Sequence, residues 1–170
     1  MEENEIKDKL KVLRLELLNC GLTIGTAEHC TSGLLGASIS SMCGLSTVYG
    51  GTIVAVDSSH IEKLLEVSHN IFKTNGLVSS QVACQMALGG LYKLDVDICV
   101  SIVGNVTIPY AEEDVDNIVW ICVATMLDKK VDFIYQKIEV DGLRGQNIET
   151  AINKALDVVI GAIKKIEEEE

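Results

Sequence analysis

Apolar residues recur every three or four positions at both ends of the chain, which is the spacing of one face of an amphipathic helix. In the first segment, residues 1–20, the pattern stops at Gly21, and glycine commonly follows a helix end. The second segment covers residues 146–166 and is followed by four glutamates at 167–170. We therefore predict an N-terminal helix, a C-terminal helix and a solvated acidic tail.

Between these helices, continuous apolar or β-branched runs are typical of strands covered on both faces. Residues 117–126 and 131–140 flank a short polar break and predict an antiparallel hairpin. Asp57 or Ser58, and later Ser79 or Ser80, are suitable N-caps for two helices. The fold class predicted is α/β, a three-layer α/β/α arrangement with a mixed, mostly parallel sheet. The other expected strands are at 22–27, 47–56 and 96–103. The other expected helices are at 34–42, from the cap at Asp57 or Ser58 through Leu65, and after Gly76.

Composition supports one domain over residues 1–170, because 48% of the 170 residues are hydrophobic and no linker interrupts them. The formal net charge of −11 disfavours nucleic acid and anionic membrane surfaces. No apolar run approaches the roughly 20 residues of a membrane span, and we expect a cytoplasmic protein with reduced cysteines. The three histidines and six cysteines show no metal-ligand spacing, so no metal site is predicted.

The best local candidate for chemistry is the turn at residues 28–33, which follows a strand and opens a helix. Backbone N–H groups at a helix start attract anions, and Ser32 and Gly33 would allow a phosphate or carboxylate to approach. The alternative interpretation is that Thr31 or Ser32 only caps the helix.

The run Thr26-Ala27-Glu28-His29-Cys30-Thr31-Ser32-Gly33-Leu34-Leu35 resembles the opening motif of the CinA C-terminal domain, the nicotinamide-nucleotide amidase family. The resemblance extends through residues 49–56 and 64–65, then 76–83, 142–144 and 155–156, in the family's order and spacing. It implies the fold of that domain. Because it starts almost at the beginning of the chain, we expect the N-terminal domain of full-length CinA proteins to be missing.

The family hydrolyses the carboxamide of nicotinamide mononucleotide with a serine activated by a lysine, beside a tyrosine, a threonine and an arginine. In this chain His29 occupies the serine position, and only Arg144 remains of the polar set. The positions of the family's tyrosine, lysine and threonine fall on Val56, Ile61 and Val103. Since isoleucine transfers no proton, the resemblance implies a degenerate site without amidase activity.

We therefore predict a CinA C-terminal-like protein that retains at most a vestigial pocket for a small anionic or nucleotide-like ligand, without a cofactor. One alternative is an active amidase or related amidohydrolase with relocated groups, such as Cys30, Ser32, or Ser58 beside Asp57 with His60 as base. Another is a protein interaction module, and a homo-oligomer is compatible with each of these readings. The residues expected to bind ligand are His29, Thr31, Ser32, Gly33, Asn105 and Arg144.

Overall fold

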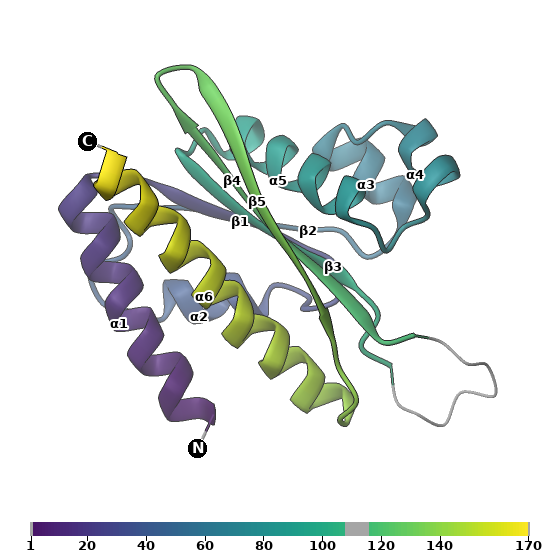
Figure 1. Cartoon of the computed structure of the whole chain (residues 1–170), viewed down its shortest axis with the longest axis horizontal. Helices are drawn as coiled ribbons and strands as arrows, with labels where there is room; N and C mark the ends of the chain where they lie inside the picture. The colour runs from purple at the N-terminus through teal and green to yellow at the C-terminus, as the bar shows by residue number, and fades with distance from the viewer. Residues whose placement is uncertain (1, 108–115, 170) are drawn as a thin grey trace.

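The computed structural model describes residues 2–107 and 116–169, which form a five-stranded sheet with helices on both faces (Figure 1). The strand order is β2-β1-β3-β4-β5. β1 pairs in parallel with both β2 and β3, whereas β3, β4 and β5 pair antiparallel. The mixed sheet is confirmed, although parallel and antiparallel pairings are equal in number because the second half of the chain contributes a hairpin. The strands are β1 (Ile24–Glu28), β2 (Tyr49–Val54), β3 (Ile98–Gly104), β4 (Ile118–Leu127) and β5 (Lys130–Glu139).

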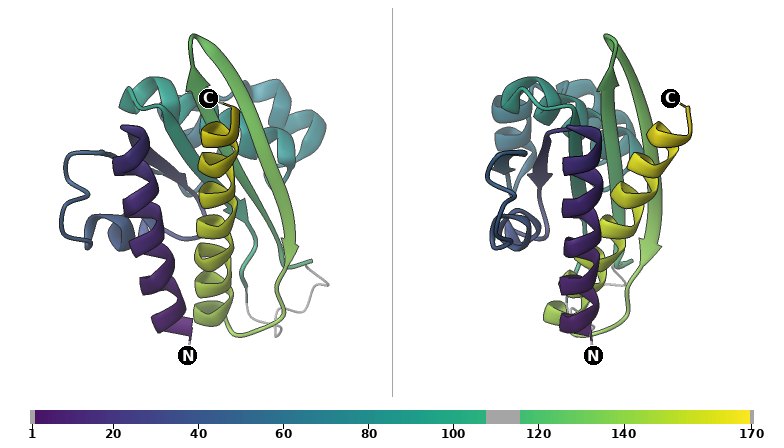
Figure 2. Two further views of the ribbon diagram at one scale, coloured as in Figure 1. Left: turned by 60° about the vertical axis from the view of Figure 1, so that its left-hand side comes forward. Right: turned by 90° about the vertical axis from the view of Figure 1, so that its left-hand side faces the viewer.

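The helices divide between the two faces, and the predicted three layers are present. α1 and α6 lie side by side on one face (Figure 2), where their apolar sides join α2 in the larger core cluster. α3 and α5 cover the other face around a second cluster that includes Ile61 and Met86. The helices are α1 (Glu2–Cys20), α2 (Leu34–Ser40), α3 (Ser58–Leu65), α4 (His69–Asn75), α5 (Ser80–Leu94) and α6 (Arg144–Glu169).

Local capping agrees with the sequence at two helices. The Asp57 carboxylate accepts a hydrogen bond from the N–H of His60 at the start of α3, 3.0 Å away. Ser79 Oγ accepts from the N–H of Val82 at the start of α5. Each side-chain oxygen satisfies a donor that the first helical turn leaves without a backbone partner.

The C-terminal helix is longer than predicted. α6 begins at Arg144 and continues to Glu169, so residues 167–169 are helical rather than a separate tail. Cys20 Sγ donates to Glu167 Oε1 at 3.2 Å, which ties this end of α6 to the end of α1. Glu170 lies outside the described residues.

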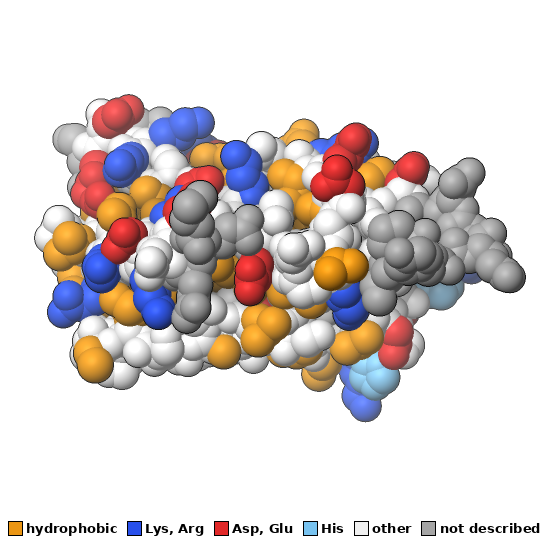
Figure 3. All heavy atoms as spheres, turned by 90° about the horizontal axis from the view of Figure 1, so that it is seen from below, with side chains coloured by type: hydrophobic (Ala, Val, Ile, Leu, Met, Phe, Trp, Pro, Cys, Tyr) orange, Lys and Arg blue, Asp and Glu red, His pale blue; other side chains and the backbone are white. Residues whose placement is uncertain are grey.

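The acidic excess does not gather into one patch on the face drawn in Figure 3, where acidic, basic and apolar side chains are interspersed. Within residues 2–107 and 116–169, no helix is both long enough and apolar enough to cross a membrane.

Candidate functional site

The candidate site lies at the carboxyl end of β1, the strand in the middle of the parallel part of the sheet. Because β1 runs parallel to β2 and β3, the carboxyl ends of all three strands meet at one edge. α2, which follows β1, joins one core cluster, and α3 and α5, which follow β2, join the other. The chain thus leaves neighbouring strands toward opposite faces, and such a switch point is where open α/β sheets form a crevice for ligands.

The last residue of β1, Glu28, is completely buried, and its carboxylate is surrounded by hydrogen-bond donors. Oε1 accepts from Thr26 Oγ1 at 3.0 Å and from the N–H of Gly36 at 2.8 Å. Oε2 accepts from Thr31 Oγ1 at 2.5 Å and from the N–H groups of Gly33 and Leu35 at 3.1 and 3.2 Å. A buried carboxylate is costly unless its oxygens are paired, and here five donors satisfy it.

This arrangement corrects the expectation that the turn offers free amides to an anion. The N–H groups of Gly33, Leu35 and Gly36 already bind the protein's own carboxylate, which occupies the favourable end of the α2 dipole. Neither Thr31 nor Ser32 is the N-cap. The cap is Gly33, in the left-handed conformation with φ 89°, and it makes no side-chain cap bond.

His29 follows Glu28 and lies between the ends of the neighbouring strands. Its backbone N–H donates to the carbonyl of Ile102 at 2.9 Å, and its Nδ1 lies 3.5 Å from the N–H of Gly104. Burial lowers the pKa of His29, whereas the backbone of Val56 and of Gly104 beside the ring acts in the opposite direction. The imidazole is therefore predominantly neutral at pH 7.

Arg144 is the first residue of α6 and approaches the same region from the other end of the chain. The loop before it is held by Asn147, whose Oδ1 accepts from the N–H of Gly142 and whose Nδ2 donates to the Gly142 carbonyl. The positive charge of Arg144 acts on both His29 and Cys30, in each case lowering the pKa. Two of the residues expected to bind ligand, more than 100 positions apart in sequence, therefore converge.

The three apolar replacements do not share one environment. Val56 is 66% exposed and follows the end of β2, so the backbone and side chain of Val56 are accessible to a ligand. Ile61 is completely buried in the cluster between α3 and α5, and Val103 is completely buried on the same side of the sheet. The positions assigned to a lysine and a threonine are thus part of the apolar core here.

The proposed substitute nucleophiles are poorly placed for catalysis. Cys30 is buried, and burial raises the pKa of its thiol to about 12, so the reactive thiolate is scarce at pH 7. Ser32 is exposed and has a left-handed backbone with φ 53°. It has no hydrogen bond to a base among those recorded for the described residues.

An acid–base pair does exist beside the site, at the start of α3. His60 Nδ1 lies 2.6 Å from Asp57 Oδ2, and Ser59 Oγ donates to Asp57 Oδ1 at 2.6 Å. These hydrogen bonds hold the pKa of Asp57 well below its usual range. Ser59 thus contacts the carboxylate rather than the imidazole. Among the described residues the candidate nucleophile, Ser58, makes no hydrogen bond to His60, so a nucleophile–base–carboxylate chain is not formed.

The remaining predicted residue, Asn105, follows β3 and is half-buried. Its N–H donates to the carbonyl of Ile118 at 2.8 Å, and its Oδ1 accepts from Thr107 at 3.2 Å. Within the part of the chain that the structure describes, no group of three or more His, Cys, Asp or Glu side chains is arranged to hold a metal ion.

The model of the CinA C-terminal domain matches residues 7–163, which is most of the chain. The chain belongs to the CinA C-terminal domain family. A CinA-like protein from Dictyoglomus turgidum is 44% identical over 88 residues, covering 52% of this chain and 21% of that relative. The Protein MG115 homolog of Mycoplasma pneumoniae is 39% identical over 94 residues, covering 55% of this chain and 60% of that protein. The chain thus spans about a fifth of the length of the first relative.

Solved structures give the same fold. The competence/damage inducible protein CihA from Agrobacterium tumefaciens aligns with a TM-score of 0.83 and 24% identity, covering 94% of this chain and 96% of that one. A CinA superfamily protein from Escherichia coli aligns with a TM-score of 0.81, covering 91% and 88%. At such low identity the likeness shows the fold alone. The sequence-based assignment of family and fold is therefore confirmed.

Sequence reasoning missed the role of Glu28, although a signal was available. An acidic residue at the end of a buried strand, with threonines two positions before and three positions after it, requires partners on several sides. It also missed the backbone of Gly104, because only the pairing of β1 with β3 brings that residue next to His29.

Proposed function

We propose that this member of the CinA C-terminal domain family binds a small anionic or nucleotide-like ligand at Arg144 and lacks the amidase chemistry that its resemblance implies. The observation that carries the proposal is the position of Arg144. Its guanidinium is exposed at the start of α6, its charge acts on His29 and Cys30, and no carboxylate partner is recorded for it among the described residues. Anions prefer such a site because a charge-assisted, bidentate contact is strong.

The turn after β1 contributes shape rather than donors to this proposed site. Its amides are engaged by Glu28, so Thr31 and Gly33 position the backbone around His29 instead of binding ligand directly. The ligand contacts that remain are the guanidinium of Arg144, the imidazole of His29 and the amide of Asn105. A net charge of −11 disfavours anions elsewhere on the protein, which makes a local cation more important.

Ligand binding is tested by thermal unfolding with nicotinamide nucleotides and other nucleoside monophosphates. A ligand that binds only the folded chain stabilises it by RT ln(1 + [L]/Kd), so the melting temperature rises with ligand concentration. We expect a concentration-dependent rise that Arg144→Ala abolishes. Lys164→Ala is the matched control, because it removes one positive charge near the far end of the same helix and should leave the rise unchanged. If none of these ligands stabilises the protein at millimolar concentration, the ligand-binding proposal fails.

Loss of catalysis is tested separately, by ammonia release from nicotinamide mononucleotide. Amide hydrolysis needs a nucleophile and a group that transfers its proton, and the corresponding positions hold His29 and the buried Ile61. We expect no ammonia above a control without protein. Turnover that disappears in Ser32→Ala or Cys30→Ala would contradict this and favour a rebuilt hydrolase, whereas the thermal-shift result would stand on its own.

A further inference from the structure

Two of the six cysteines lie in direct contact although they are far apart in the chain. Cys84 is on α5 and Cys122 is on β4, and their sulfur atoms are 3.4 Å apart. All six cysteines are free thiols in the structure. Neither Cys84 nor Cys122 belongs to the site around Arg144 and His29, so the pair is a separate cluster of nucleophilic groups.

The register of the sheet and one hydrogen bond hold the two sulfurs together. Cys122 lies opposite Ser101 in the pairing of β3 with β4, so both side chains point to the same face of the sheet. Ser101 Oγ donates to the carbonyl of Ala83 on α5 at 2.6 Å, and Ala83 directly precedes Cys84. Ser101 is completely buried, so water does not compete for this bond. The helix is thereby fixed over the strand pair at the point where the thiols meet.

The two thiols differ in burial and in their part in the hydrogen bond between them. Cys122 is completely buried and donates its S–H to the sulfur of Cys84, which is partly exposed. This bond lowers the pKa of Cys84, whereas the same bond together with burial raises the pKa of Cys122. Because the thiolate is the nucleophile, Cys84 is the sulfur that reacts first, and Cys122 is a protonated thiol beside it.

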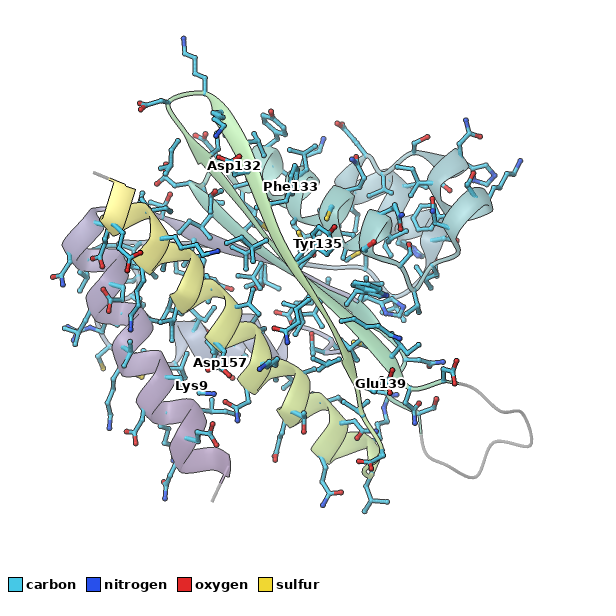
Figure 4. All side chains as sticks on the ribbon, viewed as in Figure 1. Lys9, Asp132, Phe133, Tyr135, Glu139 and Asp157 are labelled. Carbon is cyan, nitrogen blue, oxygen red and sulfur yellow. The ribbon has the colours of Figure 1, made fainter. Side chains whose placement is uncertain are left out.

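The pair lies close to the exposed outer strand of the sheet. Tyr135 on β5 (Figure 4) is opposite Cys122 in the pairing of β4 with β5, so its side chain is on the same face as Cys122. Tyr135 is 57% exposed, so the helices on this face leave its side chain uncovered. A small oxidant that approaches from solvent therefore meets the partly exposed Cys84 before the buried Cys122.

A third sulfur on this face, Cys99, is not available for the same chemistry. It lies on β3 two positions before Ser101 and is completely buried. A Cβ added at Gly90 of α5 would come within 2.3 Å of Cys99 Sγ, so this sulfur packs directly on the helix. Burial raises the pKa of Cys99 well above its usual range. Cys99 is therefore a packed core residue and a suitable control for Cys84.

We propose that Cys84 and Cys122 are an oxidation site at which a small hydroperoxide, such as hydrogen peroxide, forms a disulfide between α5 and β4. The Cys84 thiolate attacks one peroxide oxygen and the O–O bond breaks. Cys84 becomes a sulfenic acid, and the hydroxide that leaves takes up a proton to give water. The Cys122 sulfur then attacks the Cys84 sulfur, and the S–O bond breaks as the hydroxyl group leaves with the Cys122 proton as a second water. Two thiols and one peroxide thus give one disulfide and two waters, a two-electron oxidation of the protein.

The geometry suits the second step. A disulfide joins its sulfurs at about 2.0 Å, so these two must approach by roughly 1.4 Å from their present separation. Rotation about the Cα–Cβ bond of the partly exposed Cys84 supplies such a movement. A small dithiol reverses the reaction by thiol–disulfide exchange and is itself oxidised to a disulfide. The oxidation uses no group of the site at Arg144, so it holds whether or not a ligand binds there.

The first test maps the oxidised bond in the wild-type protein. The reduced chain is treated with a few molar equivalents of hydrogen peroxide, its remaining thiols are blocked with N-ethylmaleimide in denaturant, and its peptides are analysed by mass spectrometry. Before blocking, we expect the intact mass to fall by about 2 Da, and dithiothreitol should restore it. We expect one cross-linked peptide pair, containing Cys84 and Cys122. A disulfide between other cysteines, or no cross-link, would overturn the proposal.

The second test assigns the two roles with variants. In Cys122→Ala the second step is removed, so we expect the sulfenic acid of Cys84 to accumulate and to be trapped by dimedone. Cys84→Ser should give neither the cross-link nor a dimedone adduct at Cys122. Cys43→Ser and Cys99→Ala remove one exposed and one buried thiol outside the pair, and both should keep the cross-link. A dimedone adduct at Cys122 in Cys84→Ser, or loss of the cross-link in Cys43→Ser, would contradict the assignment.

Discussion

Two charged groups lie near the end of β1, and they differ in how completely the protein satisfies them. The Glu28 carboxylate is fully buried and accepts five hydrogen bonds from its own chain. Arg144 is exposed, and no hydrogen bond or ion pair is recorded for it among the described residues. A satisfied group stabilises the fold, whereas a charge left open to solvent is available to a ligand. On our proposal, the site thus divides into a structural half around Glu28 and a ligand-binding half around Arg144.

Replacing Glu28 should have the largest effect on the free energy of unfolding. A small effect would contradict the comparison. Glu28→Ala leaves the Thr31 hydroxyl and three amides without their partner, each costing about 1–3 kcal/mol, whereas the Thr26 hydroxyl keeps its hydrogen bond to Thr52. We expect the free energy of unfolding to fall by roughly 3 kcal/mol or more, measured by denaturant titration. Glu149→Ala, an exposed carboxylate on α6, should change it by less than about 0.5 kcal/mol. A small loss for Glu28→Ala would mean that the cage is not structural.

The rate of alkylation tests the same difference between buried and exposed groups on two thiols. Because burial raises the pKa of Cys30 to about 12, its thiol should react with iodoacetamide at least about a hundredfold more slowly than exposed Cys43 at pH 7.5. Mass spectrometry of timed samples gives both rates in one experiment. Comparable rates would place Cys30 among the functional groups and revive it as a nucleophile.

The pH dependence of the free energy of unfolding tests whether His29, which lies between the two halves of the site, is neutral in the folded protein. Burial lowers its pKa in the folded protein, so the unfolded chain binds more protons near and below the ordinary histidine pKa of about 6.5. Stability from this residue is therefore present above that pH and is lost as the pH falls. We expect the wild type to lose more unfolding free energy than His29→Gln between pH 7.5 and 5.5, by less than about 1 kcal/mol. The opposite sign would indicate that His29 is stabilised as a cation.

The elements predicted best from the sequence are those with a strong apolar period. The long helices at both ends and the hairpin of β4 and β5 follow directly from spacing. α4 was not predicted, because none of its residues is fully buried and it shows no apolar period. The start of α6 at Arg144 was also missed by two residues, since capping there comes from Asn147 and Gln146 within the helix.

The sequence by itself determined the family and the α/β class, because these depend on local order and spacing, and it predicts that the family's polar residues are replaced. Only the tertiary structure decided what the remaining residues do. The amides after β1 are engaged because Glu28 folds back beneath them, and Ile61 is buried because α3 packs on α5. The charge of Arg144 acts on His29 because α6 begins near the carboxyl edge of the sheet, a proximity that no spacing along the chain encodes.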